Sequence, residues 1–192
     1  WLEKSNAIGL EASRLTFGMD NDMLGAWAQQ DYKVNDVLFE VPICCLYGMD
    51  NVDTSSNMVT RIRAAATKLG DPSRCTSELL IWLGMIEAKN DKNHHHYAYM
   101  QSLDSEMTPN ILEWPEHLVK IFTKLRPQMT TDVDGMLNRY AELLDIARDD
   151  VEQDWLPRSI YNKKSLAWAY GHYCSRRYPG KYSEFVSAAD KQ

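Results

Sequence analysis

The pattern of apolar and polar positions separates a short β-rich beginning from a longer helical remainder. After a turn cluster at residues 18–22, the apolar residues Val37, Phe39 and Val41 stand at alternate positions, and Pro42 ends the run. Such alternation is typical of a half-buried strand, which a proline interrupts. The beginning of the chain therefore predicts a small antiparallel β unit.

From Asp53 onward the apolar positions recur with the period of a helix. Asp53 or Thr54 can cap the start of this first helix, and Gly70 marks its end. Its expected apolar face consists of Met58, Ile62, Ala65, Ala66 and Leu69. The sequence therefore predicts a change from strand to helix near residue 53.

Further helical segments follow. One helix should begin near Pro115, because proline fits the first helical turn. The others are a helix with Leu79, Leu83 and Ile86, a short ordered stretch at 97–103 within a polar loop at 90–114, a long amphipathic helix over 133–147 and a last helix over 166–173. We predict an α+β fold, with a β portion at residues 1–52 and a mostly helical portion at 53–192 as a single structural unit.

Composition narrows the classes of protein that the chain can belong to. A length of 192 residues and a hydrophobic content of 44% support one domain with a real core. The 21 basic and 27 acidic residues give a net charge of −6 without a basic block, so nucleic acid is not an expected partner. No apolar run approaches the roughly 20 residues that span a bilayer, so we expect no membrane span.

The cysteines and the first residue bear on compartment and processing. The cysteines, at positions 44, 45, 75 and 174, have neither CxxC spacing nor the density of a secreted disulfide scaffold. We therefore expect reduced thiols in a reducing intracellular compartment. The chain begins with Trp1 and has no signal-peptide pattern, from which we expect a processed or partial chain.

Four segments carry a resemblance to one protein family, in one common order. They are a glycine-bearing turn with a following strand at 22–42, which includes Val-Leu-Phe-Glu-Val-Pro at 37–42; Tyr-Ala-Tyr-Met-Gln-Ser-Leu at 97–103; Thr108-Pro109 with Trp-Pro-Glu-His-Leu at 114–118; and Trp-Ala-Tyr-Gly-His-Tyr-Cys-Ser-Arg at 168–176. In this order they resemble SET-domain protein methyltransferases of the Rubisco large-subunit lysine methyltransferase type. The resemblance implies a partial SET domain interrupted by a helical insert.

The resemblance also implies a reaction, the transfer of a methyl group from S-adenosylmethionine to a protein side-chain nitrogen, usually that of a lysine. Such an enzyme aligns a neutral amine behind the electrophilic sulfonium methyl group in a channel that excludes water, and it requires no metal. The expected cofactor is therefore S-adenosylmethionine. The expected partners are a protein substrate or partner subunits.

The cofactor residues that the resemblance implies are Asp22, Leu24 and Gly25, whose turn would supply backbone groups to the amino-acid end of the cofactor. Arg176 would form a fixed hydrogen-bonded pair with the methionine carboxylate.

For the substrate amine, the resemblance implies a channel faced by Ser175 and Tyr178. An aromatic wall there would hold an ammonium group by cation–π attraction. A competing explanation is that Ser175 and Arg176 are simply the exposed end of a helix.

Two features depart from the family pattern. Met23 stands where the family has the first glycine of a Gly-x-Gly turn, and the chain ends at Gln192, before an Asn-His motif and a channel tyrosine can be placed. We therefore assign no catalytic residue and expect these residues alone to be inactive. Three explanations stay open. The chain can be part of a longer active enzyme, the ordered part of such an enzyme, or a short relative that only binds.

Two other functions also stay open. One is a catalytically inactive SET-like subunit that acts as a scaffold in a larger assembly, and the other is methylation of histidine. Relatives of this type occur in plastids and in the cytoplasm or nucleus, so either location is expected.

Several conspicuous residues have structural explanations. Consecutive histidines cannot easily converge on one ion, so we expect His94 to His96 in a solvated loop, with His96 in a packing role, and no metal site. Burial is expected for Cys44 and Cys45, which act as small hydrophobic residues. It is also expected for the tryptophans at positions 27, 82, 114 and 168.

Overall fold

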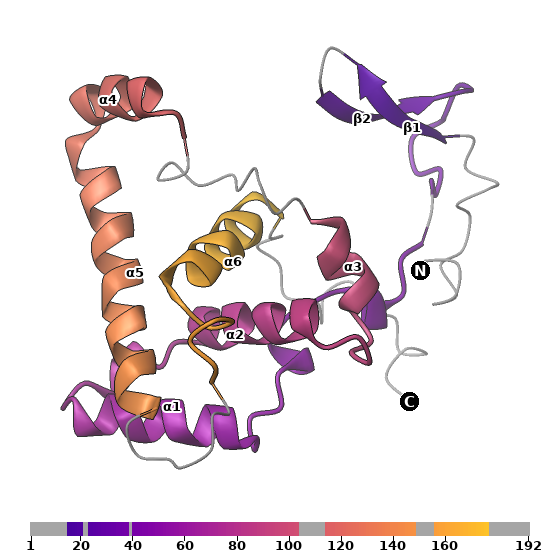
Figure 1. Cartoon of the computed structure of the whole chain (residues 1–192). Coiled ribbons are helices and arrows are strands. Elements are labelled where there is room, and N and C mark those ends of the chain that lie inside the picture. The colour runs from indigo at the N-terminus through magenta and orange to yellow at the C-terminus, as the bar shows by residue number, and fades with distance from the viewer. Residues whose placement is uncertain (1–14, 21–22, 39, 104–113, 149–155, 177–192) are drawn as a thin grey trace.

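Helices dominate the computed structural model, and a two-stranded antiparallel sheet precedes them in the part of the chain that is described (Figure 1). The structure describes residues 15–20, 23–38, 40–103, 114–148 and 156–176. The elements are β1 (Leu15–Asp20), β2 (Met23–Ala28), α1 (Asn57–Lys68), α2 (Ser77–Asn90), α3 (Tyr97–Ser102), α4 (Glu116–Leu125), α5 (Pro127–Arg148) and α6 (Lys163–Arg176), with short 3-10 helices at Ile43–Cys45, Met49–Asn51 and Pro72–Arg74. The predicted order of a small β unit followed by helices is confirmed.

Strands β1 and β2 form a hairpin at one corner of the molecule (Figure 1). Gly18 lies directly opposite Gly25, and Thr16 lies opposite Trp27. The turn cluster expected at 18–22 is displaced, because residues 18–20 belong to β1. Residues 21 and 22 lie outside the described residues.

The prediction of a strand over residues 37–41 is wrong. Its described residues form no strand apart from a single bridge at Glu40, and Phe39 lies outside the described residues. The side chains of Val37 and Leu38 are 70% and 39% exposed. Alternating apolar positions favour a strand only where a neighbouring element covers them, and here nothing covers Val37.

The core is organised around α2, which is buried on nearly all sides. Its buried residues are Leu79, Leu80, Ile81, Trp82, Leu83, Gly84, Met85, Ile86 and Ala88. A helix that is apolar all round must be enclosed by other elements. Helices α3 and α6 pack on α2, and α5 packs on both α1 and α6 (Figure 1). Burial of each leucine or isoleucine in such a core contributes about 1.5–3 kcal/mol.

The starts of α1 and α2 are capped by hydroxyl groups. Ser56 Oγ accepts a hydrogen bond from the Val59 amide at 3.3 Å, and Thr76 Oγ1 accepts one from the Leu79 amide at 3.1 Å. The prediction that Asp53 or Thr54 caps α1 is therefore wrong, because Ser56 is the N-cap residue. The Asp53 carboxylate instead accepts the Ser55 amide in the preceding turn.

The predicted end of α1 is confirmed. Gly70 follows the helix with a φ of +72°, a left-handed conformation that glycine adopts without steric cost.

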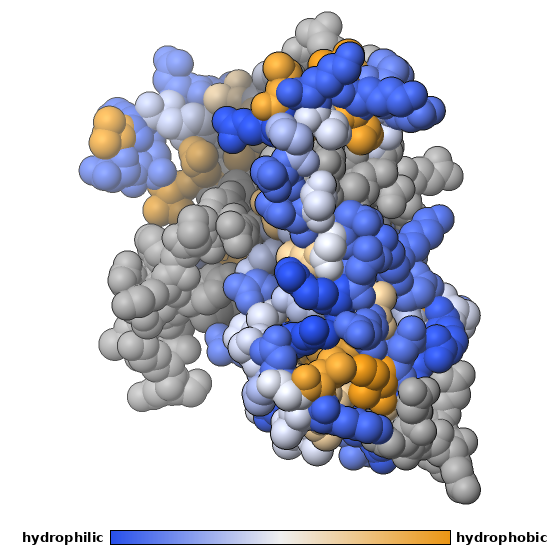
Figure 2. All heavy atoms as spheres, turned by 90° about the vertical axis from the view of Figure 1, so that its left-hand side faces the viewer, coloured by the Kyte–Doolittle hydropathy of each residue, from blue (hydrophilic) through white to orange (hydrophobic). Residues whose placement is uncertain are grey.

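The helices expected after α2 are also confirmed. Pro115 is the N-cap residue of α4, and the short ordered stretch is α3. Helix α4 lies across the end of α5, and its exposed apolar residues are Leu118, Ile121 and Leu125. Figure 2 shows hydrophobic side chains near the top of the molecule, where α4 lies, and a second hydrophobic patch low on the same face, with mostly hydrophilic side chains between them.

The tryptophan and cysteine predictions are each half right. Trp82 and Trp168 are buried, whereas Trp27 and Trp114 are partly exposed. Likewise, Cys45 is buried and Cys44 is exposed. The exposed tryptophans lie on the hairpin and beside α4, away from the enclosed helix α2.

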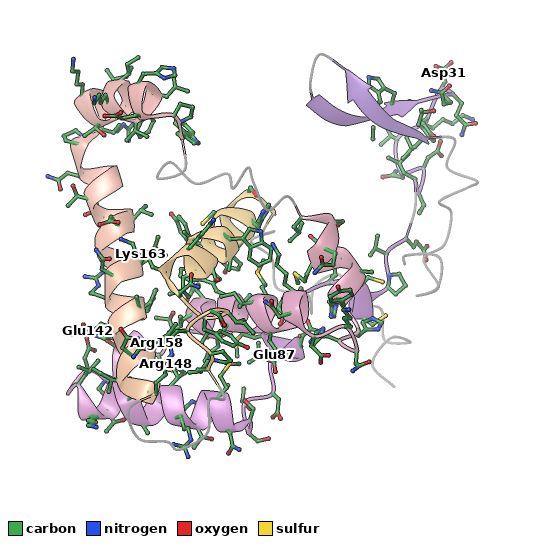
Figure 3. The ribbon with its side chains drawn as sticks, viewed as in Figure 1. Asp31, Glu87, Glu142, Arg148, Arg158 and Lys163 are labelled. Atoms are coloured by element: carbon green, nitrogen blue, oxygen red, sulfur yellow. The ribbon has the colours of Figure 1, made fainter. Side chains whose placement is uncertain are left out.

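A junction of charged residues fixes α6 relative to α5, and Figure 3 shows Arg148, Arg158 and Lys163 around it. Arg148 donates through Nε to the Leu156 carbonyl at 2.8 Å and through Nη2 to the Tyr161 carbonyl. Its Nη1 pairs with Asp145 at 2.7 Å, and Arg158 pairs with the same carboxylate. These bonds hold the chain on both sides of residues 149–155.

Gly84 allows the segment before α1 to pack on α2. A Cβ atom at Gly84 would overlap the hydroxyl oxygen of Tyr47, with Tyr47 Cζ at 3.4 Å. The Tyr47 ring is largely enclosed, and this burial raises its pKa well above the usual value for tyrosine. The absence of a side chain at residue 84 is therefore a condition for this packing.

Replacement of this glycine tests the contact. Gly84→Ala should lower the free energy of unfolding by about 1–3 kcal/mol, as overpacked cores do. Combination with Tyr47→Phe should recover part of the loss, because the overlapping hydroxyl is gone. The measurement is urea denaturation followed by circular dichroism.

Gly135→Ala in α5 is the matched control. A Cβ there meets nothing within 4 Å. This variant should raise stability by up to about 1 kcal/mol, since alanine favours a helix over glycine. Equal stability changes for the two alanine variants would contradict the proposed contact.

Candidate functional site

The structure places the predicted cofactor residues in two separate parts of the molecule. Leu24 and Gly25 lie in β2, whereas Ser175 and Arg176 are the last residues of α6. Figure 1 shows the hairpin apart from α6. The described part of the chain does not bring the two groups together, and their common role at one cofactor stays a prediction.

Two predicted residues, Asp22 and Tyr178, lie outside the described residues. Gly25 is a strand residue, two positions into β2, rather than a residue of the turn. It faces Gly18, so neither residue of this pair carries a side chain. On the side where a Cβ of Gly18 would point, the nearest atom is Cζ3 of Trp27 at 3.8 Å, so the Trp27 ring lies beside this point of the hairpin.

The end of α6 is anchored by buried aromatic rings. The His172 side chain is 2% exposed, and its ring packs edge-on against Trp168 with centroids 5.2 Å apart. Ser175 is exposed, and its hydroxyl donates to the His172 carbonyl at 3.1 Å. A serine hydroxyl can accept hydrogen bonds as well as donate one. The geometry thus agrees both with an exposed helix end and with a residue that meets a substrate.

An aromatic cluster connects α2, α5 and α6. Trp82 makes edge-on contacts with Tyr140, Tyr170 and Tyr173, with centroid distances of 5.5, 5.4 and 6.1 Å. The buried indole nitrogen of Trp82 has no hydrogen-bond partner among the described residues. Such pairs add about 0.5–1.5 kcal/mol beyond burial, so the cluster fixes the position of α6 on α2.

The three consecutive histidines are not all solvated. His96 is 2% exposed and packs edge-on against Tyr47, with ring centroids 5.0 Å apart. The rings of His95 and His94 lie 4.9 and 5.7 Å from that of His96. The solvated-loop prediction is wrong for His96, since its ring turns inward just before α3, but its packing role is confirmed.

The environment of His96 disfavours its charged form. Burial, followed by the neighbouring charges of His95 and His94, lowers the pKa of this imidazole. In the described ranges, no three histidine, cysteine or acidic side chains are arranged to hold one metal ion. Nor is any described helix both long enough and apolar enough to cross a membrane.

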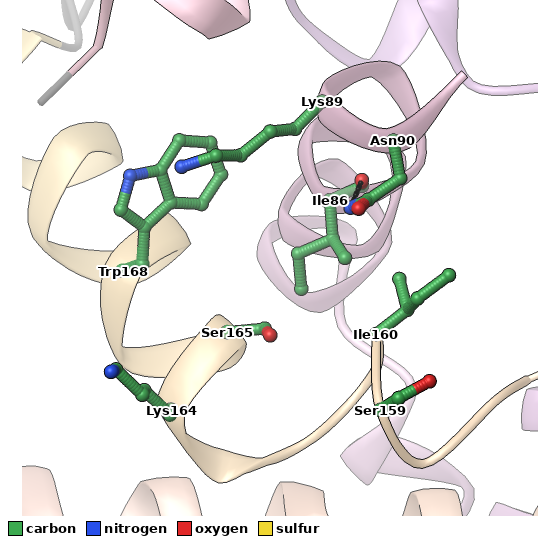
Figure 4. Close-up of a pocket in the computed structure, with 8 residues that line it drawn as sticks. All are labelled: Ile86, Lys89, Asn90, Ser159, Ile160, Lys164, Ser165 and Trp168. Atoms are coloured by element: carbon green, nitrogen blue, oxygen red, sulfur yellow. Dashed lines mark hydrogen bonds between the residues drawn. The ribbon is translucent and has the colours of Figure 1, made fainter. Parts of the chain in front are cut away.

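A pocket of about 280 Å³ lies where the end of α2 meets the start of α6 (Figure 4). Its lining comes from α2, from the residues before α6 and from the first turns of α6: Ile86, Lys89, Asn90, Ser159, Ile160, Lys164, Ser165 and Trp168. Sequence reasoning missed this pocket, because more than sixty residues separate its two halves along the chain. Two of its residues were predicted in other roles: Ile86 as an apolar residue of a helix, and Trp168 as a buried residue of a family-like segment.

Comparisons of the chain with protein-family models, with curated proteins and with solved structures give no match. The resemblance to SET-domain methyltransferases therefore rests on the sequence segments and their order.

The buried imidazole predicts a pH dependence of stability. Because the folded state lowers the pKa of His96, the unfolded state binds the proton more tightly, with an ordinary pKa of about 6.5. The free energy of unfolding should therefore fall as the pH drops from about 7 to 5. The measurement is urea denaturation at a series of pH values.

His96→Phe should reduce this slope, because phenylalanine can fill the space beside Tyr47 without titrating. His117→Gln, at an exposed position of α4, is the control and should leave the slope unchanged. An unaltered slope in His96→Phe would show that other groups cause the pH dependence.

Proposed function

We propose that the chain is part of an S-adenosylmethionine-dependent protein N-methyltransferase of the SET type, directed at lysine. The order of the four family-like segments is the single observation that carries this proposal. The small hairpin ahead of a helical body supports it, since a SET portion with a helical insert requires that arrangement. The proposed cofactor is S-adenosylmethionine, and the proposed partner is a protein substrate.

Each proposed residue has a defined task in this reaction. The backbone around Leu24 and Gly25 would contact the amino-acid end of the cofactor, and the Arg176 guanidinium would pair with its carboxylate. Ser175 would accept a hydrogen bond from the substrate amine and so help to align its lone pair with the methyl group. The amine attacks the methyl carbon, the carbon–sulfur bond breaks, and S-adenosylhomocysteine leaves.

A catalytically inactive SET-like scaffold is the second candidate. It is favoured by Met23 in place of the first turn glycine and by the separation between the hairpin and the end of α6. The exposed apolar residues of α4 also suit an assembly surface. Under this proposal the chain binds other subunits and does not bind the cofactor.

Titration calorimetry with S-adenosylhomocysteine tests the methyltransferase proposal on this chain and on the full-length product of the same gene. Arg176→Ala should weaken binding by the full-length product at least about tenfold, because a charge-assisted pair contributes roughly 1.5–3 kcal/mol. Arg139→Ala, at an exposed position of α5, is the matched control and should bind normally.

The outcomes separate the two candidates. Binding that is lost in Arg176→Ala but kept in Arg139→Ala supports the methyltransferase. A folded full-length product that binds no S-adenosylhomocysteine rules it out. If binding supports the methyltransferase, incorporation of a radioactive methyl group into lysine or into histidine of a protein substrate identifies the target side chain.

A further inference from the structure

The pocket between α2 and α6 combines an apolar floor with a polar rim. Ile86 and Trp168 are almost fully buried, and Ile160 is half-buried, so these three side chains form the apolar part. The rim residues, shown in Figure 4, are Lys89, Asn90, Ser159, Lys164 and Ser165. A few polar groups around an apolar floor are typical of sites for small molecules.

The charge of the lining is positive in a chain whose net charge is negative. Among the residues that the structure describes, two lysines and no carboxylate line the pocket, although the chain has a formal charge of −6. The neighbouring Lys163 is engaged by Asp134 at 2.6 Å. Lys164, by contrast, has no ion pair among the described residues. Its charge is therefore available to a ligand.

The second positive charge at the pocket belongs to Lys89, whose side chain contacts Trp168. The ammonium nitrogen of Lys89 lies 3.9 Å from the centroid of the Trp168 ring, over its face (Figure 4). A cation–π contact of this kind restricts the lysine side chain without neutralising its charge.

Polar groups on the rim are also held in place. The Asn90 amide nitrogen donates to the Ile86 carbonyl at 2.7 Å. Asn162 caps the start of α6 through a bond from the Ser165 amide at 3.0 Å. The positive end of this helix dipole therefore lies at the pocket, and it favours a negative ligand.

We propose that this pocket binds a phosphate monoester with a small apolar body. The Lys164 ammonium group and the positive end of the α6 dipole suit a negative head group, the hydroxyls of Ser159 and Ser165 can donate to its oxygens, and the apolar floor suits the organic part. A volume of about 280 Å³ fits a single ring with its phosphate but not a dinucleotide. The phosphate can belong to a free metabolite or to a phosphorylated tyrosine.

This inference does not rest on the proposed methyltransferase function. Of the residues predicted to contact the cofactor or the substrate, those that the structure describes, Leu24, Gly25, Ser175 and Arg176, do not line the pocket. Failure to bind S-adenosylhomocysteine would leave the pocket proposal standing, and failure to bind a phosphate monoester would leave the methyltransferase proposal standing.

Calorimetric titration with phenyl phosphate tests the proposal. Phenyl phosphate should bind more tightly than inorganic phosphate, which lacks the apolar body, and more tightly than phenol, which lacks the charge. Lys164→Gln should weaken binding at least about fivefold, since it removes a charge-assisted hydrogen bond. Ser159→Ala, on the exposed rim, should weaken it less.

Lys124→Gln, at an exposed position of α4, is the matched control and should bind phenyl phosphate as the unaltered chain does. Absence of phenyl phosphate binding by the folded chain would overturn the proposal, as would equal affinities of Lys164→Gln and the unaltered chain. Tighter binding of a phosphotyrosine peptide than of phenyl phosphate would identify a protein as the source of the phosphate.

Discussion

The fold depends on the enclosure of α2. This helix has buried residues around nearly its whole circumference, so it cannot exist at a surface and must be covered by other parts of the chain. Helices α3 and α6 cover it directly, and Tyr47 reaches it where Gly84 leaves room. A missing side chain at Gly84 makes room for Tyr47, and edge-on aromatic contacts together with a charged junction position α6.

The position of α6 follows from the aromatic contacts and the charged junction, and it determines what the molecule can bind. The aromatic cluster around Trp82 sets the distance between α6 and α2, and the bonds of Arg148 fix the approach of the chain to α6. Together they create the pocket at one end of α6 and present Ser175 at the other end. A single helix therefore contributes to both candidate binding regions, and its two ends can act independently.

The helices could be predicted from the sequence because their determinants are local. Apolar residues at helical spacing, a proline before α4 and a glycine after α1 each act within a few residues of one another. The prediction of a strand over 37–41 was wrong for the opposite reason. Alternating apolar residues describe the segment itself, but they do not say which neighbouring element covers its apolar side chains. The cap of α1 was missed because Asp53 binds its own turn.

The candidate sites were less predictable, because they combine residues that are distant along the chain. The inward turn of His96 depends on Tyr47, almost fifty positions earlier, and the pocket depends on how α6 meets α2. No short-range pattern contains this information. The family-like segments name residues for a cofactor, and two of these, Asp22 and Tyr178, lie outside the described residues.

The bonds of Arg148 have a consequence for how this molecule can vary. One guanidinium binds carbonyl groups at Leu156 and Tyr161, so it joins the end of α5 to the chain that resumes after residue 155. Replacement of Arg148 would release both carbonyl groups at once, so this position tolerates less variation than one whose side chain holds a single partner.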